Sequence, residues 1–461
     1  MNSFRFLLAV IAGKSAYLAS RLNGGAGAAL PGLVAERVYP GVLEVLSQQC
    51  TGGSIVICGT NGKTTTSRIL SEALNPSHPN LVYNRSGSNL IRGHIAAFLE
   101  QSSWSGKLHA DLAILETDEA VLPHLLKRLS TVRAIVLHNL FRDQLDRYGE
   151  VDTIARKWLE ALKANLKPET ILLINADDPS LAFIARELRH PHTVFYGLDD
   201  SDQGSKQPTS TLDAILSPIS GKELEYSTYY LSHLGDYKDS SSDFRRPELA
   251  VAAQKIAVSE SGFSFELHTS QQSLTLSSSL PGLYNLYNAL AASACFLELS
   301  QDTAALTKAV KNNSGAFGRF EKIQIDNKEL VLCLIKNPVG ATEVMRTLST
   351  SQVPYSIALL ANDNFADGQD VSWYWDAQFE LLKDGKAFFC GGTRAEDMAV
   401  RLKYAGITLP IAVEPDIAPL FDRIISQTPA QKVYVLTTYT AAMALQKLLS
   451  DRGYKQPYWQ E

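Results

Sequence analysis

Apolar residues follow two alternating patterns in the first part of the chain. Short runs rich in Val, Ile and Leu alternate with longer stretches in which apolar residues recur at helical spacing. The runs predicted as strands are 54–58, 111–115, 132–137 and 170–174, and the helical stretches include 4–22, 151–164 and 181–188. Because strands that alternate with helices usually pair in parallel, the pattern predicts a parallel sheet covered by helices on both faces. The expected fold class is α/β.

The pattern changes in the middle of the chain and then returns. Residues 200–246 are rich in Ser, Asp, Gln and Lys and predict a loop or a small inserted module, whereas 249–279 alternate apolar and polar residues as antiparallel strands do. Apolar runs resume after a cluster of Asn, Ser and Gly at 312–320; they are 330–335, 355–361, 387–390, 411–413 and 432–436. We expect two domains, residues 1–315 and 316–461, with an insert at about 210–247 in the first.

The composition is that of an ordinary globular protein. Of the 461 residues, 45% are hydrophobic and 20% are charged, with a net charge of −5, which excludes a mainly disordered, collagen-like or coiled-coil chain and gives no reason to expect a nucleic-acid partner. The five cysteines are too widely spaced for a disulfide framework or a zinc finger and predict core thiols in a cytosolic protein. An apolar run at 4–11 is too short to span a bilayer, and a buried helix and a secretion signal are its two interpretations.

The clearest chemical motif follows the first predicted strand. The run IVICGTNGKTTT is an apolar strand that enters a glycine-containing turn, followed by Lys63, Thr64 and a predicted helix. Gly59 and Gly62 would let several N–H groups face one point, and the helix would add its positive end. Lys63 would then reach the β- and γ-phosphates of a nucleotide, and Thr64 would hold Mg²⁺. The alternative is a tight surface turn with a solvated lysine, because Ile57 stands where the longer phosphate-loop motif has glycine.

Other polar residues follow the predicted strands of this sheet. Glu116 closes the strand 111–115, and an acid at the carboxyl end of a parallel strand lies in the ligand crevice, so Glu116 is predicted as a second Mg²⁺ contact. Asp118 and Glu119 come next and are interpreted more simply as charges at a helix N-terminus. His138, after another predicted strand, has no partners at metal-ligand spacing and is predicted as a hydrogen-bonded core residue.

Several segments resemble one family. The loop GTNGKTT resembles the phosphate loop of the Mur ligases, which are ATP-dependent ligases of peptidoglycan synthesis, and further motifs narrow the resemblance to the MurT branch. These motifs are NRSGSNL at 84–90, NLFRDQLDRYGE at 139–150, NADDP at 175–179, YGLDD at 196–200, LYNLYNA at 283–289, FGRFE at 317–321, KNPVG at 336–340 and DGQDVSWYWD at 367–376. They occur in order over nearly the whole chain.

The resemblance implies a Mur ligase-like central ATP-binding domain and a C-terminal Rossmann-like domain. It also implies one subunit of a lipid II isoglutaminyl synthase, in which ATP and Mg²⁺ activate the α-carboxylate of D-glutamate in the lipid II stem peptide, and ammonia from a GatD-type glutaminase subunit gives D-isoglutamine. Such a protein would be cytoplasmic and would meet its membrane-embedded substrate at the inner face of the membrane. The nucleotide-binding residues that the resemblance carries over are Gly59, Thr60, Asn61, Gly62, Lys63, Thr64, Thr65, Asn285, Asn288 and Arg319. Helix capping is the alternative role for the two later asparagines, and a surface charge for the arginine.

The chain departs from the MurT pattern at one place. Members of that branch commonly carry a four-cysteine zinc ribbon in the central domain, but here the four ligand positions hold Ser217, Ser220, Asp239 and Ser242. Hydroxyl groups do not replace thiolates on zinc. We therefore expect no zinc, and a metal-free hairpin or a flexible loop in place of the ribbon.

A glutaminase needs a Cys nucleophile, a His base and an acid that orients the His, and no such set is evident in the chain. The resemblance suggests that the partner carries the Cys and the His and that this chain donates the acid. Asp370 is the candidate, followed by Asp376 and Asp367; the alternative is that Asp370 caps a helix beginning near Val371. Two other functions stay open at this point: a stand-alone amino-acid ligase similar to folylpolyglutamate synthases, and a non-catalytic nucleotide-binding scaffold.

Overall fold

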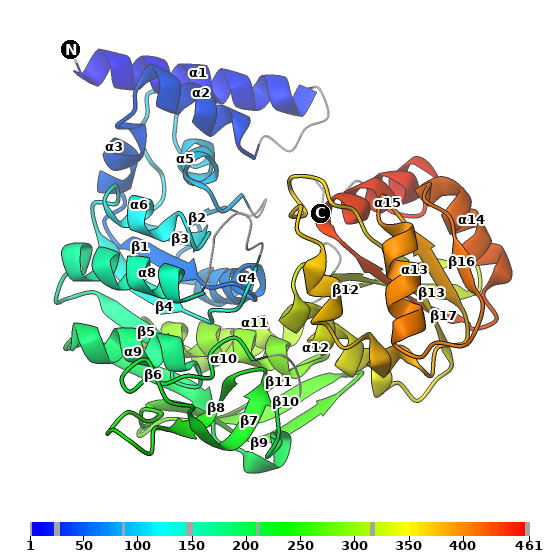
Figure 1. Cartoon of the computed structure of the whole chain (residues 1–461). Coiled ribbons are helices and arrows are strands. Elements are labelled where there is room, and N and C mark those ends of the chain that lie inside the picture. The colour runs from blue at the N-terminus through cyan, green and yellow to red at the C-terminus, as the bar shows by residue number, and fades with distance from the viewer. Residues whose placement is uncertain are drawn as a thin grey trace.

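The computed structural model describes residues 2–22, 28–84, 88–143, 151–208, 212–313 and 319–456. Within these residues the chain forms a nine-stranded sheet, a six-stranded sheet and a separate two-stranded hairpin. The first sheet and its helices form the blue-to-green part of Figure 1, and the second forms the yellow-to-red part beside it. The predicted boundary at 315 lies outside the described residues.

The nine-stranded sheet has the order β11-β10-β9-β6-β5-β4-β1-β3-β2. Its strands are β1 (Gly53–Cys58), β2 (Val82–Tyr83), β3 (Leu112–Thr117), β4 (Val132–Leu137), β5 (Ile171–Asn175), β6 (Thr193–Leu198), β9 (Val251–Ser259), β10 (Gly262–His268) and β11 (Ser273–Ser278). Strands β1 to β6 pair in parallel, β9 continues in parallel from β6, and β10 and β11 add antiparallel strands at the edge. The predicted α/β class and the antiparallel segment are confirmed.

Helices cover both faces of this sheet, and alternate residues of β1 show why. Ile55 and Ile57 pack in the core that contains residues of α4 and α10, whereas Val56 and Cys58 pack in the core that contains residues of α1, α3 and α5. A strand buried on both faces has to be apolar throughout, which explains the unbroken apolar run. The helices are α1 (Asn2–Leu22), α2 (Leu30–Val38), α3 (Val42–Gln48), α4 (Lys63–Leu74), α5 (Ile91–Glu100), α6 (Leu122–Leu126), α8 (Val151–Asn165), α9 (Pro179–Leu188), α10 (Leu283–Leu297) and α11 (Thr303–Asn312).

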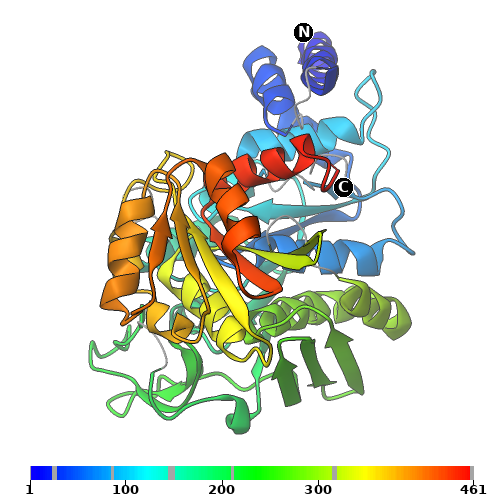
Figure 2. The same ribbon diagram turned by 90° about the vertical axis from the view of Figure 1, so that its right-hand side faces the viewer.

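The six-stranded sheet has the order β12-β13-β17-β14-β15-β16, with β12 antiparallel to β13 and the other pairs parallel. Its strands are β12 (Arg319–Ile325), β13 (Lys328–Leu334), β14 (Tyr355–Leu360), β15 (Phe388–Gly391), β16 (Ile411–Val413) and β17 (Lys432–Thr437). The helices around it are α12 (Pro338–Ser349), α13 (Ala395–Tyr404), α14 (Ile417–Gln427) and α15 (Tyr439–Asp451), with short 3₁₀ turns η2 (Ser372–Trp375) and η3 (Phe379–Leu382). Figure 2 brings this sheet to the front, and α1 stays at the top edge of the molecule in both views.

The polar segment 200–246 contains a short 3₁₀ turn, η1 (Ser201–Gln203), and a hairpin of β7 (Glu225–Leu231) and β8 (Leu234–Lys238). All five cysteines are buried free thiols, as predicted. Over the described part of the chain, no helix has the length and apolar character needed to cross a bilayer.

Candidate active site

The predicted phosphate loop connects β1 to α4. Gly59 and Gly62 have φ angles of 154° and 88°, which residues with a side chain rarely adopt. A Cβ on Gly62 would come within 2.0 Å of Asn288 Oδ1 on α10. The loop therefore requires glycine and lies against α10. It leaves β1 between β3 and β4, at the carboxyl edge of a parallel sheet, where ligands of such sheets bind.

Lys63 begins α4, and oxygen atoms enclose its ammonium group. Nζ donates to the carbonyl oxygens of Gly59 and Thr60 and lies 3.1 Å from Glu119 Oε2. Burial disfavours the ammonium ion, but nearby carboxylates, above all Glu119, outweigh burial, so the pKa of Lys63 lies above its usual value. The pKa of Glu119 is lowered, because the charges of Lys63 and Lys336 outweigh its burial. The interpretation of Glu119 as a charge at a helix N-terminus is wrong: α6 begins at Leu122 without an acid in its first turn, and Glu119 is a buried counter-ion of the loop lysine.

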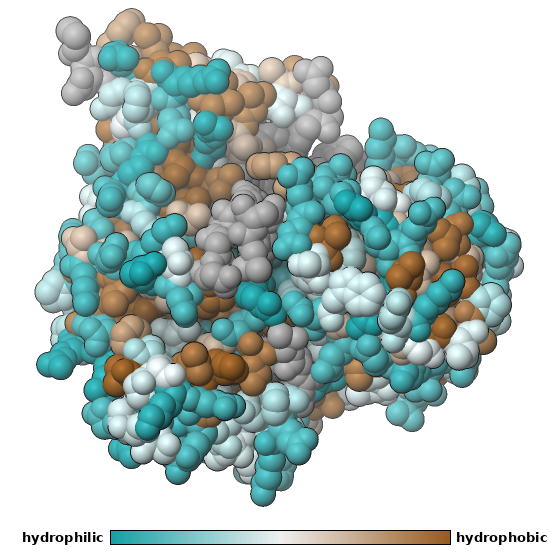
Figure 3. All heavy atoms as spheres, viewed as in Figure 1, coloured by the Kyte–Doolittle hydropathy of each residue, from teal (hydrophilic) through white to brown (hydrophobic). Residues whose placement is uncertain are grey.

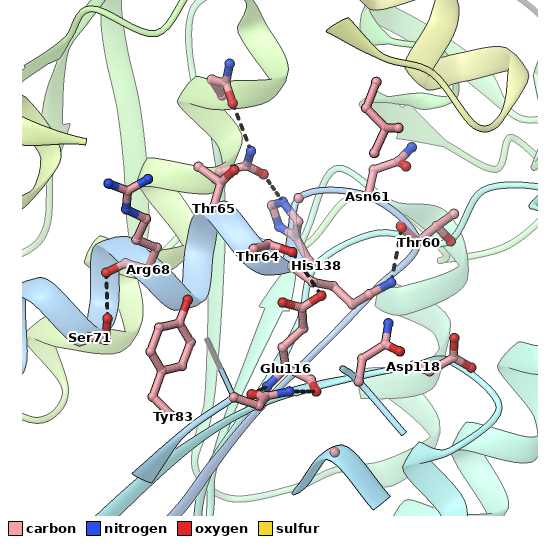
Figure 4. Close-up of a pocket in the computed structure, with 18 of the residues that line it drawn as sticks. Thr60, Asn61, Thr64, Thr65, Arg68, Ser71, Tyr83, Glu116, Asp118 and His138 are labelled. Atoms are coloured by element: carbon pink, nitrogen blue, oxygen red, sulfur yellow. Dashed lines mark hydrogen bonds between the residues drawn. The ribbon is translucent and has the colours of Figure 1, made fainter. Parts of the chain in front are cut away.

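Thr64 and Glu116, predicted as Mg²⁺ contacts, lie next to each other (Figure 4), with Thr64 Oγ1 donating to Glu116 Oε1 at 3.0 Å. Asn84 fixes the backbone of Glu116: its Oδ1 accepts from the Glu116 N–H, and its Nδ2 donates to the Glu116 carbonyl, both at 3.0 Å. His94 Nε2 donates to the same carbonyl at 2.8 Å. Glu116 is thus the fifth residue of β3 and not the residue after a strand.

A hydroxyl and a carboxylate side by side fit Mg²⁺, which prefers hard oxygen ligands. In proteins Mg²⁺ is usually held by one or two carboxylates together with substrate phosphates and water. Among the described residues no group of three or more His, Cys, Asp or Glu side chains could hold a metal ion by itself. The pair Thr64 and Glu116 therefore suits a cation that arrives with a phosphate ligand.

His138 connects the phosphate loop to α10. Its Nε2 donates to Asn288 Oδ1 at 2.8 Å, and its Nδ1 accepts from the Tyr196 hydroxyl at 3.0 Å. Asn288 Nδ2 donates to Asn285 Oδ1 at 3.2 Å, so the two asparagines share one face of α10, while Gly282 occupies the N-cap that the capping alternative assigned to an asparagine. Burial lowers the pKa of His138 to about 4, which keeps the ring neutral and fixes the direction of these hydrogen bonds. The predicted core histidine also lines the site.

The connection between β13 and α12 brings the C-terminal sheet onto the phosphate loop. Lys336 Nζ donates to Asp143 Oδ2 at 2.6 Å and to the Thr60 carbonyl at 3.1 Å. Asn337, the N-cap of α12, donates from Nδ2 to Asn61 Oδ1 at 3.0 Å. Burial raises the pKa of Asp143 although Lys336 opposes the shift. The two sheets therefore meet at the loop itself.

A cavity of about 1650 Å³ opens in front of these groups. This volume exceeds that of an ordinary small-molecule pocket, roughly 300–1,000 Å³, and leaves room for a nucleotide and a second, larger ligand. Its walls come from both ends of the chain. Lining residues outside the phosphate loop include Tyr17 and Arg21 of α1, Arg68 of α4, Lys308 of α11, Glu343 of α12 and Asp367.

The three candidate acids for a glutaminase triad have different surroundings. Asp367 lines the cavity and accepts from the N–H and the hydroxyl of Thr440, at 2.7 and 2.5 Å. Asp370 is half-buried and accepts from the Ser372 N–H at 2.9 Å. The N-cap of η2 is Val371, so Asp370 lies one residue before the capping position that its alternative interpretation gives it. Asp376 forms an ion pair with an arginine of the central domain. These contacts do not test a role in glutamine hydrolysis, and the assignment of Asp370 stays a prediction.

The positions of the four missing cysteines converge in a hydrogen-bonded cluster beside the hairpin. Ser217 Oγ and Ser242 Oγ both donate to Asp239 Oδ2 at 2.6 Å, and the Ser220 N–H donates to Ser217 Oγ at 3.2 Å. The bonds from Ser217 and Ser242 lower the pKa of Asp239. The segment is therefore an ordered hairpin and not a wholly flexible loop, and the expectation of no zinc stays a prediction.

Some sequence predictions fall where the structure gives no description. The backbone of Arg319 begins β12, but its side chain lies outside the described residues. The same holds for residues 85–87 and 144–150 within two of the motifs.

Comparison with known proteins finds a matching family for each of the two parts of the chain. The model of the Mur ligase middle domain matches residues 57–238, and that of the MurT ligase C-terminal domain matches residues 334–442. The MurT subunit of lipid II isoglutaminyl synthase (glutamine-hydrolyzing) from Streptococcus pneumoniae is 32% identical over 450 residues, covering 96% of this chain and 97% of the relative. The subunit of the same name from Staphylococcus aureus is 33% identical over 411 residues, covering 88% and 89%. Among solved structures, a pseudomurein peptide ligase type C from Methanothermus fervidus has the same fold, with a TM-score of 0.65, 19% identity, and coverage of 88% of this chain and 80% of that one.

Proposed function

The chain belongs to the MurT family of Mur ligases, and from this premise we propose that it is the ATP-dependent subunit of a lipid II isoglutaminyl synthase. In this role it converts the α-carboxylate of D-glutamate in the lipid II stem peptide to the amide of D-isoglutamine. The observation that carries the proposal is the position of Lys63 and Thr64, directly after a glycine loop, beside Glu116 of β3 at the carboxyl edge of the central sheet.

The reaction needs an activated acid, because a carboxylate oxygen is a poor leaving group. In the proposed sequence a carboxylate oxygen attacks the γ-phosphorus of ATP, and ADP departs with the electrons of the broken bond. Ammonia then attacks the carbon of the acyl phosphate through its lone pair, phosphate departs, and the nitrogen loses a proton. Catalysis of the first step therefore depends on holding the triphosphate in line and offsetting its charge.

The residues of the loop are suited to that task. Lys63 is held as a cation with its ammonium group at the inner side of the turn, where phosphate oxygens would share or replace the contact with Glu119. Thr64 and Glu116 would hold Mg²⁺, which supplies positive charge at the phosphates when it is bound. Asn285, Asn288 and Arg319 are the proposed nucleotide contacts, and neutral His138 fixes the orientation of the Asn288 amide.

The ammonia is proposed to come from a glutaminase subunit, because the names of the two relatives describe subunits of a glutamine-hydrolyzing synthase. Asp370 is the proposed acid that orients the histidine of that partner. It precedes Trp375, which is 54% exposed and suits a contact surface. The Asp370→Asn complex should assemble and should amidate with added ammonium but not with glutamine. The same exchange at Asp367 and Asp376 tests the other two candidates, and unchanged glutamine hydrolysis by the Asp370→Asn complex would reject the assignment.

The main test incubates the purified chain with ATP, Mg²⁺, lipid II and ammonium chloride. We expect ADP release together with a product whose mass changes as for exchange of a hydroxyl for an amino group. Product formed only when an amino acid is added would indicate a stand-alone ligase. ATP binding without turnover, under conditions where added glutaminase also gives no product, would indicate a scaffold.

A further inference from the structure

Helix α1 carries a row of exposed apolar side chains along one side. Phe4, Leu8, Ile11, Leu18 and Leu22 are 66%, 41%, 40%, 50% and 88% exposed. At 3.6 residues per turn these positions fall within an arc of about 80° of the helix surface. The opposite side is also apolar, but it is buried against α2 and α5. Figure 3 shows hydrophobic residues among hydrophilic ones at the top of the molecule, where α1 and α2 lie.

The charges that α1 itself carries all have one sign. Residues 1–35 contain Arg5, Lys14 and Arg21, and the first acidic residue of the chain is Glu36. Helical geometry places Arg5 about 100° to one side of the apolar row and Arg21 about 100° to the other, and both side chains are exposed. The arrangement matches a helix that lies in the interface of a bilayer, with apolar residues towards the acyl chains and cations at the headgroups.

An aromatic residue and the cavity adjoin the same helix. Trp104 is 50% exposed, and its ring centroid lies 5.9 Å from Lys14 Nζ; tryptophan is enriched at membrane–water interfaces. Tyr17 and Arg21 line the cavity that also contains Lys63. Helix α1 therefore carries the exposed row and also contributes to the wall of the candidate active site.

We propose that the exposed row of α1 docks on the surface of a bilayer that contains anionic lipids. The contact is peripheral, and it places the mouth of the cavity beside a lipid-linked substrate; this last clause rests on the proposed function, whereas the docking does not. A second copy of the chain is a poorer occupant, because an antiparallel α1 would bring Arg5 opposite Arg21 and no carboxylate of residues 1–35 could compensate.

Flotation of the full chain with vesicles tests the docking without substrate or ATP. We expect binding to vesicles of equal parts phosphatidylcholine and phosphatidylglycerol, and weaker binding to pure phosphatidylcholine by roughly fivefold for each arginine at the surface. A triple variant, Phe4→Gln, Leu8→Gln and Leu18→Gln, should bind anionic vesicles at least about tenfold more weakly. The control exchanges three exposed apolar residues of the C-terminal domain, Val353→Gln, Val400→Gln and Leu409→Gln, and should bind as the unmodified chain does.

A fluorescent label gives a second measurement that does not depend on the triple variant. Ser15 lies within the apolar arc and is exposed, and the five native cysteines are buried, so Ser15→Cys can be labelled selectively with an environment-sensitive dye. The emission should shift to shorter wavelength when anionic vesicles are added. No shift and no flotation would overturn the proposal, as would equal loss in both triple variants. A concentration-dependent dimer that only the α1 variant abolishes, without vesicle binding, would overturn it in favour of a second copy.

The docking and the proposed function can fail separately. A chain that binds vesicles but never amidates lipid II would keep the docking surface and remove the function. A chain that amidates lipid II but does not bind vesicles would keep the proposed function and remove the docking surface. If both hold, the α1 triple variant should lose rate on lipid II in vesicles and keep the normal rate on a short-chain, water-soluble analogue.

Discussion

Replacing Glu119 with Gln removes the counter-charge of the loop lysine and keeps the side-chain volume. Lys63 and Glu119 are 6% and 3% exposed, and Nζ lies 3.1 Å from Oε2. Removing one charge of a buried pair costs about 3–5 kcal/mol, and the Gln oxygen can still accept one hydrogen bond worth about 1 kcal/mol. We therefore expect the free energy of unfolding of Glu119→Gln to fall by roughly 2–4 kcal/mol.

The same exchange should strengthen ATP binding. In the unmodified chain the phosphates compete with the Glu119 carboxylate for Lys63, whereas in the variant they meet a buried cation that has lost its main partner. Each 1.4 kcal/mol of relieved competition corresponds to about tenfold in affinity. Thermal unfolding with and without MgATP, together with calorimetric titration, measures both effects. The control is Glu225→Gln, which breaks an exposed pair with Lys238 and should change stability by less than about 0.5 kcal/mol.

Either of two results would contradict the proposed role of Glu119. Unchanged stability of Glu119→Gln would mean that Glu119 is not the group that keeps Lys63 charged in the absence of nucleotide. Lower stability combined with weaker ATP binding would mean that Glu119 supports the bound state and does not compete with it.

Two buried histidines, a glycine of the phosphate loop and the cluster around Asp239 allow further tests. Burial lowers the pKa of His94 and His138 to about 4, whereas an unfolded imidazole titrates near 6.5. The unfolded state therefore binds more protons than the folded state, and the free energy of unfolding should fall as the pH drops from about 6.5 to about 4. Denaturant titrations at several pH values should show a less steep fall for His138→Gln than for the unmodified chain. Gly62→Ala should abolish ATP binding in calorimetry because its Cβ meets Asn288, whereas Gly221→Ala, at φ 69° with no atom within 4 Å of the new Cβ, should preserve it. Asp239→Ala should speed proteolysis of the 217–242 segment and leave ATP binding intact, and metal analysis of the unmodified chain should find only substoichiometric zinc.

Much of the central fold follows from local pattern, because a strand buried on both faces has to be apolar along its whole length. The predicted strands 132–137 and 411–413 agree with β4 and β16. β3 continues to Thr117, beyond the predicted 111–115, because Glu116 lies inside the strand with its backbone held by Asn84 and His94. α10 begins at Leu283, and Asn285 and Asn288 interrupt its apolar run at the turn that faces the site. β6 and β12 were not predicted as strands; polar residues alternate with apolar ones in β12, at the edge of its sheet.

Some residues of the candidate site can be predicted from a local motif, whereas others come from distant parts of the chain and cannot. The loop and Lys63 are contiguous in sequence, so a motif suffices to identify them. Glu119, Lys336 and Asn337 reach the loop from separate elements, and no spacing in the sequence connects them to it. Only the resemblance pointed to the segment 336–340, and it assigned no contact to those residues.

In the proposed mechanism Lys63 binds the triphosphate of ATP and makes its use for amidation possible. The most direct measurement is ammonium-driven amidation of lipid II by Lys63→Ala, with Lys222→Ala, an exposed lysine, as the control. A second variant, Lys63→Met with Glu119→Gln, removes both charges of the buried pair, so that a folding defect from an unpaired carboxylate does not decide the result. We predict that both Lys63 variants lose at least about 100-fold in amide formation and ADP release, while the control is unaffected. Amidation at the normal rate by a folded Lys63 variant would contradict this role of Lys63.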